Sequence, residues 1–439
     1  MADHATSDDP AVQKQLDRLT MLSPGRDVLG LERISELMVR LGNPHRKLPP
    51  VFHVAGTNGK GSTCAFLRAS LEAAGHSVHM YTSPHLIRFN ERIRVAGRLI
   101  DDAMLAPLLA EVLDCSTDIA PSFFEATTAA AFLAFSRTPA EAAIIEVGLG
   151  GRLDATNVIG NPLVCGIAQL GIDHQAFLGD DAVTIAGEKA GIAKAGVPLV
   201  TMNYPKGETL RIAEVASNAG ASCHPKGSDW DSAPYRGQLH YRDEIGKLSV
   251  PLPRLPGTHQ AMNAALAIAM LRHQSMVAVP EPAIRAAMGW ADWPARLQQL
   301  GDGPLTRLVP GTPVWIDGCH NPASAEVVAS QIDAIIGTDT PLHIIVGVLA
   351  NKDAEGILTP FLNRATSFRA VPIPDHPHHS ADDLANWISA KGADAAPADD
   401  VACALRTLAQ SDTSTGIILI LGSLYLAGDV LRKNGEMIE

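Results

Sequence analysis

Residues 51–63 read Val-Phe-His-Val-Ala-Gly-Thr-Asn-Gly-Lys-Gly-Ser-Thr, an apolar run that passes into a glycine-rich loop and then into a helical segment. In such a loop, glycines let backbone N–H groups approach phosphate oxygens, and the helix N-terminus adds positive potential. Lys60 can reach the outer phosphates, and a hydroxyl at the start of the helix can ligate Mg²⁺. The residues predicted to surround a phosphate are Gly56, Thr57, Asn58, Gly59, Lys60, Gly61 and Ser62.

The loop departs from the common phosphate-loop spacing G-x-x-x-x-G-K-[ST]. The first glycine of that pattern falls on Val54, and its hydroxyl position falls on Gly61. An ordinary glycine-rich turn is the alternative. Because a lysine and hydroxyl residues follow an apolar strand in the required order, the sequence favours a phosphate-binding loop.

Short apolar runs alternate with helical segments along the whole chain, a pattern typical of α/β folds with a mainly parallel sheet. The runs expected to form strands are 51–55, 143–147, 163–169, 199–203, 314–317, 342–348, 368–371 and 416–421. Residues 235–250 predict a small hairpin, and residues 416–428 predict a buried strand that ends in a loop. The Gly/Pro-rich segment 301–304 predicts a linker. We therefore expect a P-loop-type ATP-binding domain over residues 1–299 and a smaller Rossmann-like α/β domain over residues 300–439.

Composition excludes several classes of protein. The 439 residues are 46% hydrophobic and 19% charged, an ordinary globular balance, and the formal charge of −12 argues against a nucleic-acid partner. The six cysteines form no CxxC pair, which favours reduced thiols. Neither the polar, acidic N-terminal segment nor any apolar run predicts export or a membrane span. A cytoplasmic protein without a membrane partner is expected.

Three polar residues follow predicted strands and are candidate ligands for Mg²⁺. Glu146 ends the apolar run 142–145, and Ser83 and His174 occupy similar positions after strands. Parallel sheets place ligands at the carboxyl ends of their strands, and hard oxygen donors suit Mg²⁺. Each residue taken alone is also compatible with a purely structural role.

Ordered blocks of this sequence resemble the folylpolyglutamate synthases and dihydrofolate synthases, a family within the ATP-dependent Mur-type ligases. The blocks are HVAGTNGKGST (53–63), YTSPHL (81–86), FNERI (89–93), SFFEATTAAAF (122–132), EVGLGGRLDATN (146–157), GIDHQAFLG (171–179), EKAGIAK (188–194), PGTHQAMNAALA (256–267), WPARL (293–297), DGCHNP (317–322) and GSLYLAG (422–428). They keep one order over nearly the whole chain. One departure is Cys319, where the family usually has alanine; it is small enough to fit.

The resemblance implies a specific reaction. ATP phosphorylates a carboxylate of a pterin-linked substrate, either dihydropteroate or a reduced folate, and the amino group of L-glutamate attacks the resulting acyl phosphate. The resemblance assigns Mg²⁺ to Ser83, Glu146 and His174, ATP to Asn263, Arg296 and Asp317, and glutamate to His320 and Ser423. It implies a monomer and favours a bifunctional enzyme.

Lys189 resembles the lysine that is carbamylated in this family, a change that would turn a cation into an anion able to support a second Mg²⁺. An ordinary helix lysine is the alternative. With Lys60 and His320, Lys189 completes the predicted catalytic residues.

Other functions stay open at this point. A folylpolyglutamate synthase without the second activity and a P-loop switch protein that binds ATP without ligation are both compatible with the motifs. A Mur enzyme acting on a nucleotide-linked peptide is disfavoured, because the phosphate-binding loop is expected to lie too near the start of the chain. The histidine-rich run 376–379 is expected to be a solvated loop, since no family motif supports a metal site there.

Overall fold

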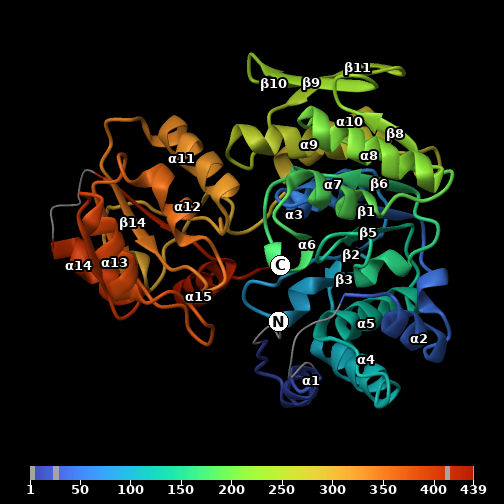
Figure 1. The fold of residues 1–439 in the computed structure, drawn as a ribbon, viewed down its shortest axis with the longest axis horizontal. Coiled ribbons are helices and arrows are strands. Elements are labelled where there is room, and N and C mark those ends of the chain that lie inside the picture. Colours follow the sequence, from blue (N-terminus) through green and yellow to red (C-terminus); the bar gives the residue numbers. More distant parts are fainter. Residues whose placement is uncertain (1–4, 23–28, 411–415, 439) are drawn as a thin grey trace. The chain divides into compact units, whose positions relative to one another are not determined.

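The computed structural model describes residues 5–22, 29–410 and 416–438. These residues form two compact units, each with its own sheet (Figure 1). The first unit comprises the chain up to Arg254 together with His259–Asp292, and the second comprises Leu255–Thr258 and the chain from Trp293 onward. The assignment of separate roles to residues 1–299 and 300–439 stays a prediction.

The first unit is built on an eight-stranded sheet in the order β4-β3-β2-β5-β1-β6-β7-β8. The strands are β1 Val51–Ala55, β2 Val78–Tyr81, β3 Ile93–Val95, β4 Arg98–Leu99, β5 Ala142–Glu146, β6 Val164–Ile167, β7 Pro198–Thr201 and β8 Ser222–Pro225. In this spatial order, every neighbouring pair from β2 across to β8 is parallel. Strands β3 and β4 extend the sheet beyond β2 with antiparallel pairs. Since β1 lies between β5 and β6, the loop that follows it emerges at the middle of the sheet.

Helices cover both faces of this sheet. They are α1 Pro10–Thr20, α2 Glu32–Arg40, α3 Lys60–Ala73, α4 Asp102–Asp114, α5 Phe123–Arg137, α6 Gln175–Leu178, α7 Ala182–Ala190, α8 Lys206–Ala219, α9 Thr258–Arg272 and α10 Glu281–Trp290. Side chains alternate across a strand, so Tyr81 and Ile145 join one core with α1, α2, α4 and α5. Helix α3 contacts β1, β2 and β5 and is itself covered by α10.

A separate three-stranded antiparallel sheet replaces the predicted hairpin. Its strands are β9 Trp230–Tyr235, β10 Gln238–Asp243 and β11 Gly246–Pro251. The predicted hairpin contains β10 and β11 but omits β9. Trp230 begins β9 because its buried ring stacks on Tyr241 of β10 at 5.8 Å, a contact across strands that local sequence does not reveal.

The second unit has a six-stranded sheet in the order β12-β13-β17-β14-β15-β16, parallel except for the β12–β13 pair. Its strands are β12 Gln298–Gln299, β13 Val314–Ile316, β14 Leu342–Val346, β15 Ser367–Ala370, β16 Ala395–Pro397 and β17 Ile417–Leu421. Its helices are α11 Pro322–Ile336, α12 Ala354–Leu358, α13 Ala381–Ala390, α14 Val401–Gln410 and α15 Leu424–Asn434. The α/β class, with one mainly parallel sheet in each unit, is confirmed.

The loop predicted after the last strand is wrong, because α15 begins at Leu424. Ser423 caps this helix by accepting the N–H of Tyr425 at 3.1 Å, and the helix buries Leu426 and Val430. The glycines and the serine suggested a loop, whereas the serine marks the start of a helix.

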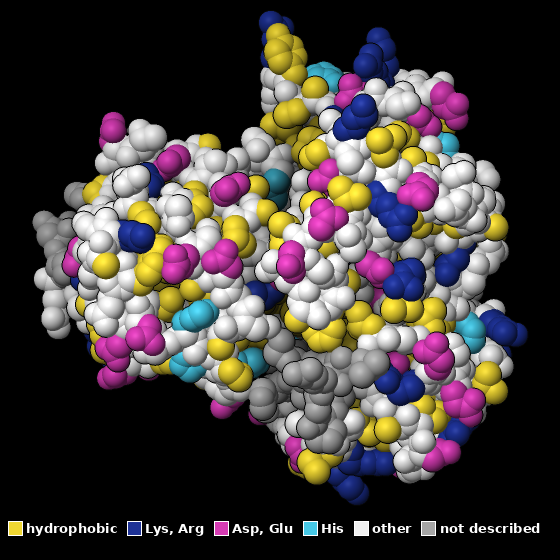
Figure 2. All heavy atoms as spheres, viewed as in Figure 1, with side chains coloured by type: hydrophobic (Ala, Val, Ile, Leu, Met, Phe, Trp, Pro, Cys, Tyr) yellow, Lys and Arg dark blue, Asp and Glu magenta, His cyan; other side chains and the backbone are white. Residues whose placement is uncertain are grey.

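The surface charges, the cysteines and the helix lengths bear on the expectations from composition. Acidic and basic side chains are interspersed over the visible face of each unit (Figure 2). All six cysteines are free thiols. Among the described residues, no helix combines the length and the apolar character needed to cross a membrane.

Candidate active site

The loop between β1 and α3 depends on two glycines. Gly59 has φ +82°, and a Cβ there would lie 2.4 Å from Oδ1 of Asn263. Gly56 has φ +147°, and a Cβ there would lie 2.8 Å from Cβ of Ala168. Both positions therefore combine a backbone conformation that favours glycine with a close approach that excludes a side chain.

Two N–H groups of this loop are already bonded within the unit. Thr57 and Asn58 donate to the carbonyl oxygen of Gln169 at 2.9 and 3.1 Å, and the hydroxyl of Thr57 donates to Gly171 at 2.9 Å. The loop is thereby fixed to the segment after β6. Helix α3 starts at Lys60, and a first helical turn offers N–H groups that have no acceptor within the helix. The start of α3 is thus the part of the loop best suited to bind an anion.

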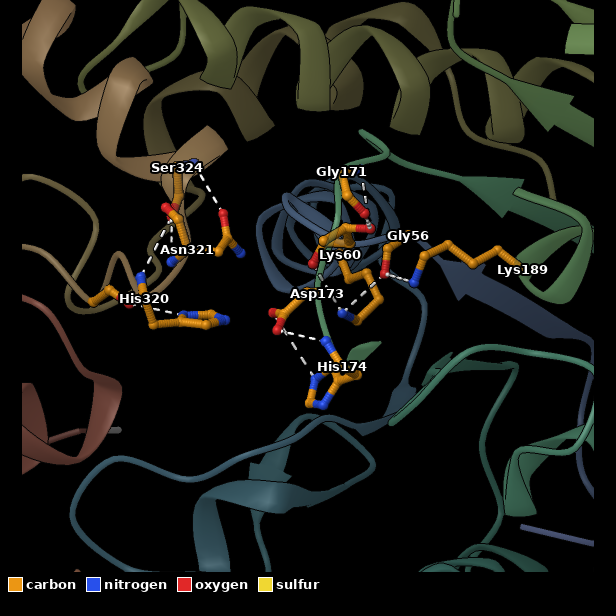
Figure 3. A network of polar contacts seen from close by, with 11 residues as sticks. Gly56, Lys60, Gly171, Asp173, His174, Lys189, His320, Asn321 and Ser324 are labelled. Carbon is orange, nitrogen blue, oxygen red and sulfur yellow. Dashed lines mark hydrogen bonds and ion pairs between the residues drawn. The ribbon is translucent and has the colours of Figure 1, made fainter. Parts of the chain in front are cut away.

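Lys60 and Lys189 converge on one backbone oxygen, that of Gly56 (Figure 3). Lys60 Nζ lies 3.1 Å from it and 3.3 Å from the carbonyl oxygen of Thr57, and Lys189 Nζ lies 3.0 Å from it. Lys189 is only 4% exposed. Burial, and then the charge of Lys60, lower the pKa of Lys189 to about 7, against an opposing influence of Asp173 and Asp154.

The carboxyl end of β5 holds Glu146, which is 3% exposed. The N–H of Ser83, in the loop after β2, donates to its Oε2 at 3.3 Å, so the structure brings these two predicted ligands together. A buried carboxylate beside a hydroxyl residue provides oxygen donors of the type that Mg²⁺ prefers.

His174, the third predicted ligand, precedes the short helix α6. Its own N–H donates to Oδ1 of Asp173 at 2.7 Å, and its ring Nε2 lies 3.9 Å from Oδ2 of the same carboxylate (Figure 3). Its side chain is 39% exposed. Within the described ranges, no group of three or more His, Cys, Asp or Glu side chains is arranged to hold a metal ion. Of the three predicted ligands, only Glu146 and His174 belong to these residue types, and Ser83 does not.

Asp154 was not predicted, although it is a fully buried acid next to the site. Its carboxylate accepts the N–H groups of Leu149 and Thr156 at 2.8 and 2.9 Å, and Thr156 in turn contacts Nε2 of His53 in β1 at 2.9 Å. Burial raises the pKa of Asp154 in spite of these bonds. The aspartate thereby fixes the segment after β5 to the central strand.

Asn263, predicted to bind ATP, lies in α9 next to Gly59 of the loop. Gln260, one turn earlier, accepts from Nδ2 of Asn263 at 3.1 Å and is fully buried. Gln260 is not among the residues predicted from the sequence. The signal available was a glutamine at i−3 from the candidate asparagine, a spacing that places two side chains on one helix face.

The second unit carries the remaining predicted residues around the end of β13. The carboxylate of Asp317 accepts the N–H groups of Leu297 and Cys319, each at 2.8 Å. Burial raises the pKa of Asp317, while the charge of Arg296 opposes that rise. Ala295 and Leu297, which flank Arg296, have φ values of +56° and +43°. Strained backbone of this kind concentrates at functional sites.

His320 and Ser423 lie at the starts of two helices of the second unit. The Nδ1 atom of His320 lies 3.1 Å from the carbonyl oxygen of Gly318, and the N-cap of α11 follows at Asn321, which accepts the N–H of Ser324 at 2.9 Å (Figure 3). Ser423 is the N-cap of α15. The N-terminal ends of helices carry positive potential, which suits the carboxylates of an amino acid.

Comparisons with known proteins show the family to which this chain belongs. A family model described as "Dihydrofolate synthetase, C-terminal domain" matches residues 309–433. The dihydrofolate synthase/folylpolyglutamate synthase of Bacillus subtilis is 35% identical over 423 residues, covering 92% of this chain and 94% of its own.

Two solved structures are similar over nearly their whole length. Escherichia coli FolC in complex with DHPP and ADP has a TM-score of 0.86 and 32% identity, covering 97% of each chain. A bifunctional folylpolyglutamate synthase/dihydrofolate synthase with Mn, AMPPNP and L-glutamate bound has a TM-score of 0.85 and 31% identity, covering 98% of this chain and 99% of its own. On the identity and coverage of these relatives, the chain belongs to the dihydrofolate synthase/folylpolyglutamate synthase family.

Proposed function

We propose that this protein joins L-glutamate to dihydropteroate and to reduced folates at the expense of ATP. The observation that carries the proposal is the position of Lys60, at the start of α3 and bonded to the carbonyl oxygen of Gly56. There its ammonium group can neutralise negative charge that develops as a phosphoryl group is transferred. The Bacillus subtilis relative is named a dihydrofolate synthase/folylpolyglutamate synthase, and the two solved structures hold ADP with DHPP and AMPPNP with L-glutamate, which supports the same reaction.

The reaction divides one difficult step into two easier ones. An oxygen of the pterin-linked carboxylate attacks the γ-phosphorus of ATP, and ADP leaves with the bonding electrons. The free amine of glutamate then attacks the acyl carbon, phosphate leaves, and the amine loses a proton. No protein nucleophile is needed, so the protein acts by positioning substrates and by stabilising charge.

The residues present fit a divalent cation. We assign Ser83, Glu146 and His174 to it: the buried carboxylate of Glu146 accepts the N–H of Ser83 at 3.3 Å, and His174 is assigned on the family resemblance. When bound, Mg²⁺ would neutralise negative charge on the phosphate oxygens of ATP. The nucleotide itself is assigned to residues 56–62, Asn263, Arg296 and Asp317.

Lys189 is assigned as a carbamylated lysine. Its amine nitrogen would attack the carbon of CO₂ and release a proton, leaving a carbamate anion. The step needs a neutral amine, and the lowered pKa of Lys189, about 7, makes that form available near neutral pH. The product would replace a cation by an anion beside Lys60 and would add oxygen donors of the kind that Mg²⁺ prefers.

Glutamate is assigned to the second unit, at His320 and Ser423. The buried Ser423 caps a helix of eleven residues, whose N-terminal end can attract a carboxylate. A cytoplasmic location and a monomeric state are part of the proposal. The location rests on the six free cysteines, and the monomeric state rests on the family resemblance.

One assay separates the proposed function from its alternatives. ADP release is measured with L-glutamate and with dihydropteroate or tetrahydrofolate, each substrate also being omitted in turn. A bifunctional ligase releases ADP with either pterin substrate, and only when glutamate is present. A folylpolyglutamate synthase alone turns over with tetrahydrofolate but not with dihydropteroate. ADP release that depends on neither substrate would instead support a nucleotide switch and overturn the proposal.

A further inference from the structure

The segment after β5 and the end of α7 touch backbone to backbone. A Cβ on Gly151 would lie 2.8 Å from the carbonyl oxygens of Glu188 and Lys189, and a Cβ on Gly191 would lie 2.4 Å from Cβ of Arg152. The N–H of Arg152 donates to the carbonyl oxygen of Glu188 at 2.8 Å. Helix α7 therefore ends against a strand-to-loop segment that leaves no room for side chains at either glycine.

Asn157 bonds to both sides of this contact. Its Nδ2 donates to the carbonyl oxygen of Arg152 at 2.9 Å and to that of Gly191 at 3.1 Å, and the residue is only 6% exposed. Because both partners are carbonyl oxygens, the amide must present its NH₂ group to them. From the loop after α7, Nζ of Lys194 donates to the backbone oxygen of Asn157 at 3.2 Å.

The position of Lys189 depends on this attachment. Lys189 stands in the last turn of α7, two residues before Gly191, and its Nζ reaches 3.0 Å from the carbonyl oxygen of Gly56. A displacement of the helix end would carry that nitrogen away from the phosphate-binding loop. The ion pair between Arg152 and Glu188 also joins the two segments, but Arg152 is 56% exposed, where such pairs contribute little.

We propose that Asn157 is a positioning residue for Lys189, holding the end of α7 against the segment after β5 so that the lysine amine stays at the phosphate-binding loop. This inference rests on the proposed role of Lys189 as a carbamylated lysine. Asn157 acts through the helix end and touches no reacting atom. Loss of its two hydrogen bonds reduces both the extent of carbamylation and the rate of turnover.

The test compares Asn157→Ala with Asn434→Ala. Asn434 is a matched control in the second unit: it is 3% exposed, and its Nδ2 donates to the backbone oxygen of Gly301 at 3.1 Å. Each variant is prepared in ¹³C-bicarbonate without added metal or nucleotide, and the carbamate ¹³C resonance is measured. The kcat, the bicarbonate concentration that gives half-maximal activity and the Tm are then measured for the wild type and both variants. Asn157→Ser, which keeps one donor, replaces Asn157→Ala if the latter does not fold.

Asn157→Ala is expected to lose most of the carbamate signal, to need more bicarbonate and to lose about ten- to a hundredfold in kcat, the usual effect of removing an outer partner of a site group. Asn434→Ala is expected to keep the signal and the bicarbonate dependence of the wild type, whatever its Tm. Equal behaviour of the two variants overturns the inference about Asn157. A wild type without a carbamate signal, together with a fully active Lys189→Ala, overturns the proposed role of Lys189 itself and is seen independently of Asn157.

Discussion

Lys60 and Lys189 donate to a single acceptor, the backbone oxygen of Gly56, at 3.1 and 3.0 Å. Burial disfavours the charged form of the Lys189 amine, and the charge of Lys60 nearby disfavours it further. The buried member, Lys189, responds with a pKa lowered to about 7. Lys189 is thus available as a neutral amine near neutral pH, next to the phosphate-binding loop.

Replacing Lys60 is expected to abolish catalysis but to leave the fold intact. We predict that Lys60→Ala lowers kcat by at least about a hundredfold, because the charge it neutralises grows as the phosphoryl group is transferred. Its Tm should stay within a few degrees of the wild type, since the side chain is only partly buried. Lys206→Ala, at the exposed start of α8, is the control and should keep full activity. Wild-type kcat in Lys60→Ala would show that the phosphate-binding assignment is wrong.

Replacing the buried Lys189 should cause a loss of activity that small carboxylic acids partly restore. Lys189→Ala is expected to lose most of its activity, and added formate or acetate should restore part of it by supplying the missing oxygens. Activity is measured against carboxylate concentration in both lysine variants. Lys60→Ala, which lacks a cation, should not respond. Full activity of Lys189→Ala, together with an unmodified amine in a high-resolution map of the Mg²⁺-bound enzyme, would make Lys189 an ordinary helix lysine.

The contact between Gly59 and Asn263 predicts a difference between two glycine variants. Gly59→Ala and Gly75→Ala both place a side chain at positive φ, which costs about 1 kcal/mol each in stability. Only Gly59→Ala also drives a Cβ to 2.4 Å from Oδ1 of Asn263, whereas Gly75 has open space around it. We expect a raised KM for ATP in Gly59→Ala and an unchanged KM in Gly75→Ala. Equal KM values for ATP in the two variants would contradict the proposed place of Asn263.

Buried His53 predicts a loss of stability in acid. Burial, and then the charge of Lys194, lower its pKa from 6.5 to about 3. Between these values the unfolded chain binds a proton that the native protein does not, so the free energy of unfolding falls as pH drops from about 6.5 toward 3. His53→Gln should show a shallower fall in the Tm of the first unit over this range, measured by calorimetry. His240→Gln is the control, and a slope in His53→Gln as steep as in the wild type would contradict the prediction.

Local sequence predicted those features that depend on neighbours along the chain. The apolar run before residue 56 and the glycines after it are sufficient to place a strand, a loop and a helix in order, and Glu146 follows from the end of another apolar run. The start of β9 depends on a ring contact between Trp230 and Tyr241, eleven positions apart. The roles of Gln260 and Asn157 depend on packing between helices and loops, which periodicity does not encode. The site residues themselves remain predictions until tested.

Helices α9 and α10 return to the first unit after the chain has passed through Leu255–Thr258 of the second. Met270 of α9 packs on β6, where its sulfur lies 2.3 Å from the position of a Cβ on Gly166, and α10 covers α3. During synthesis, β6 and the outer side of α3 leave the ribosome before α9 and α10, and they are covered only after residues 258–290 have emerged. A truncated chain that stops at the end of β11 would expose that apolar surface, and such surfaces promote aggregation. Because each unit contains two separate stretches of the chain, no single cut yields both units intact.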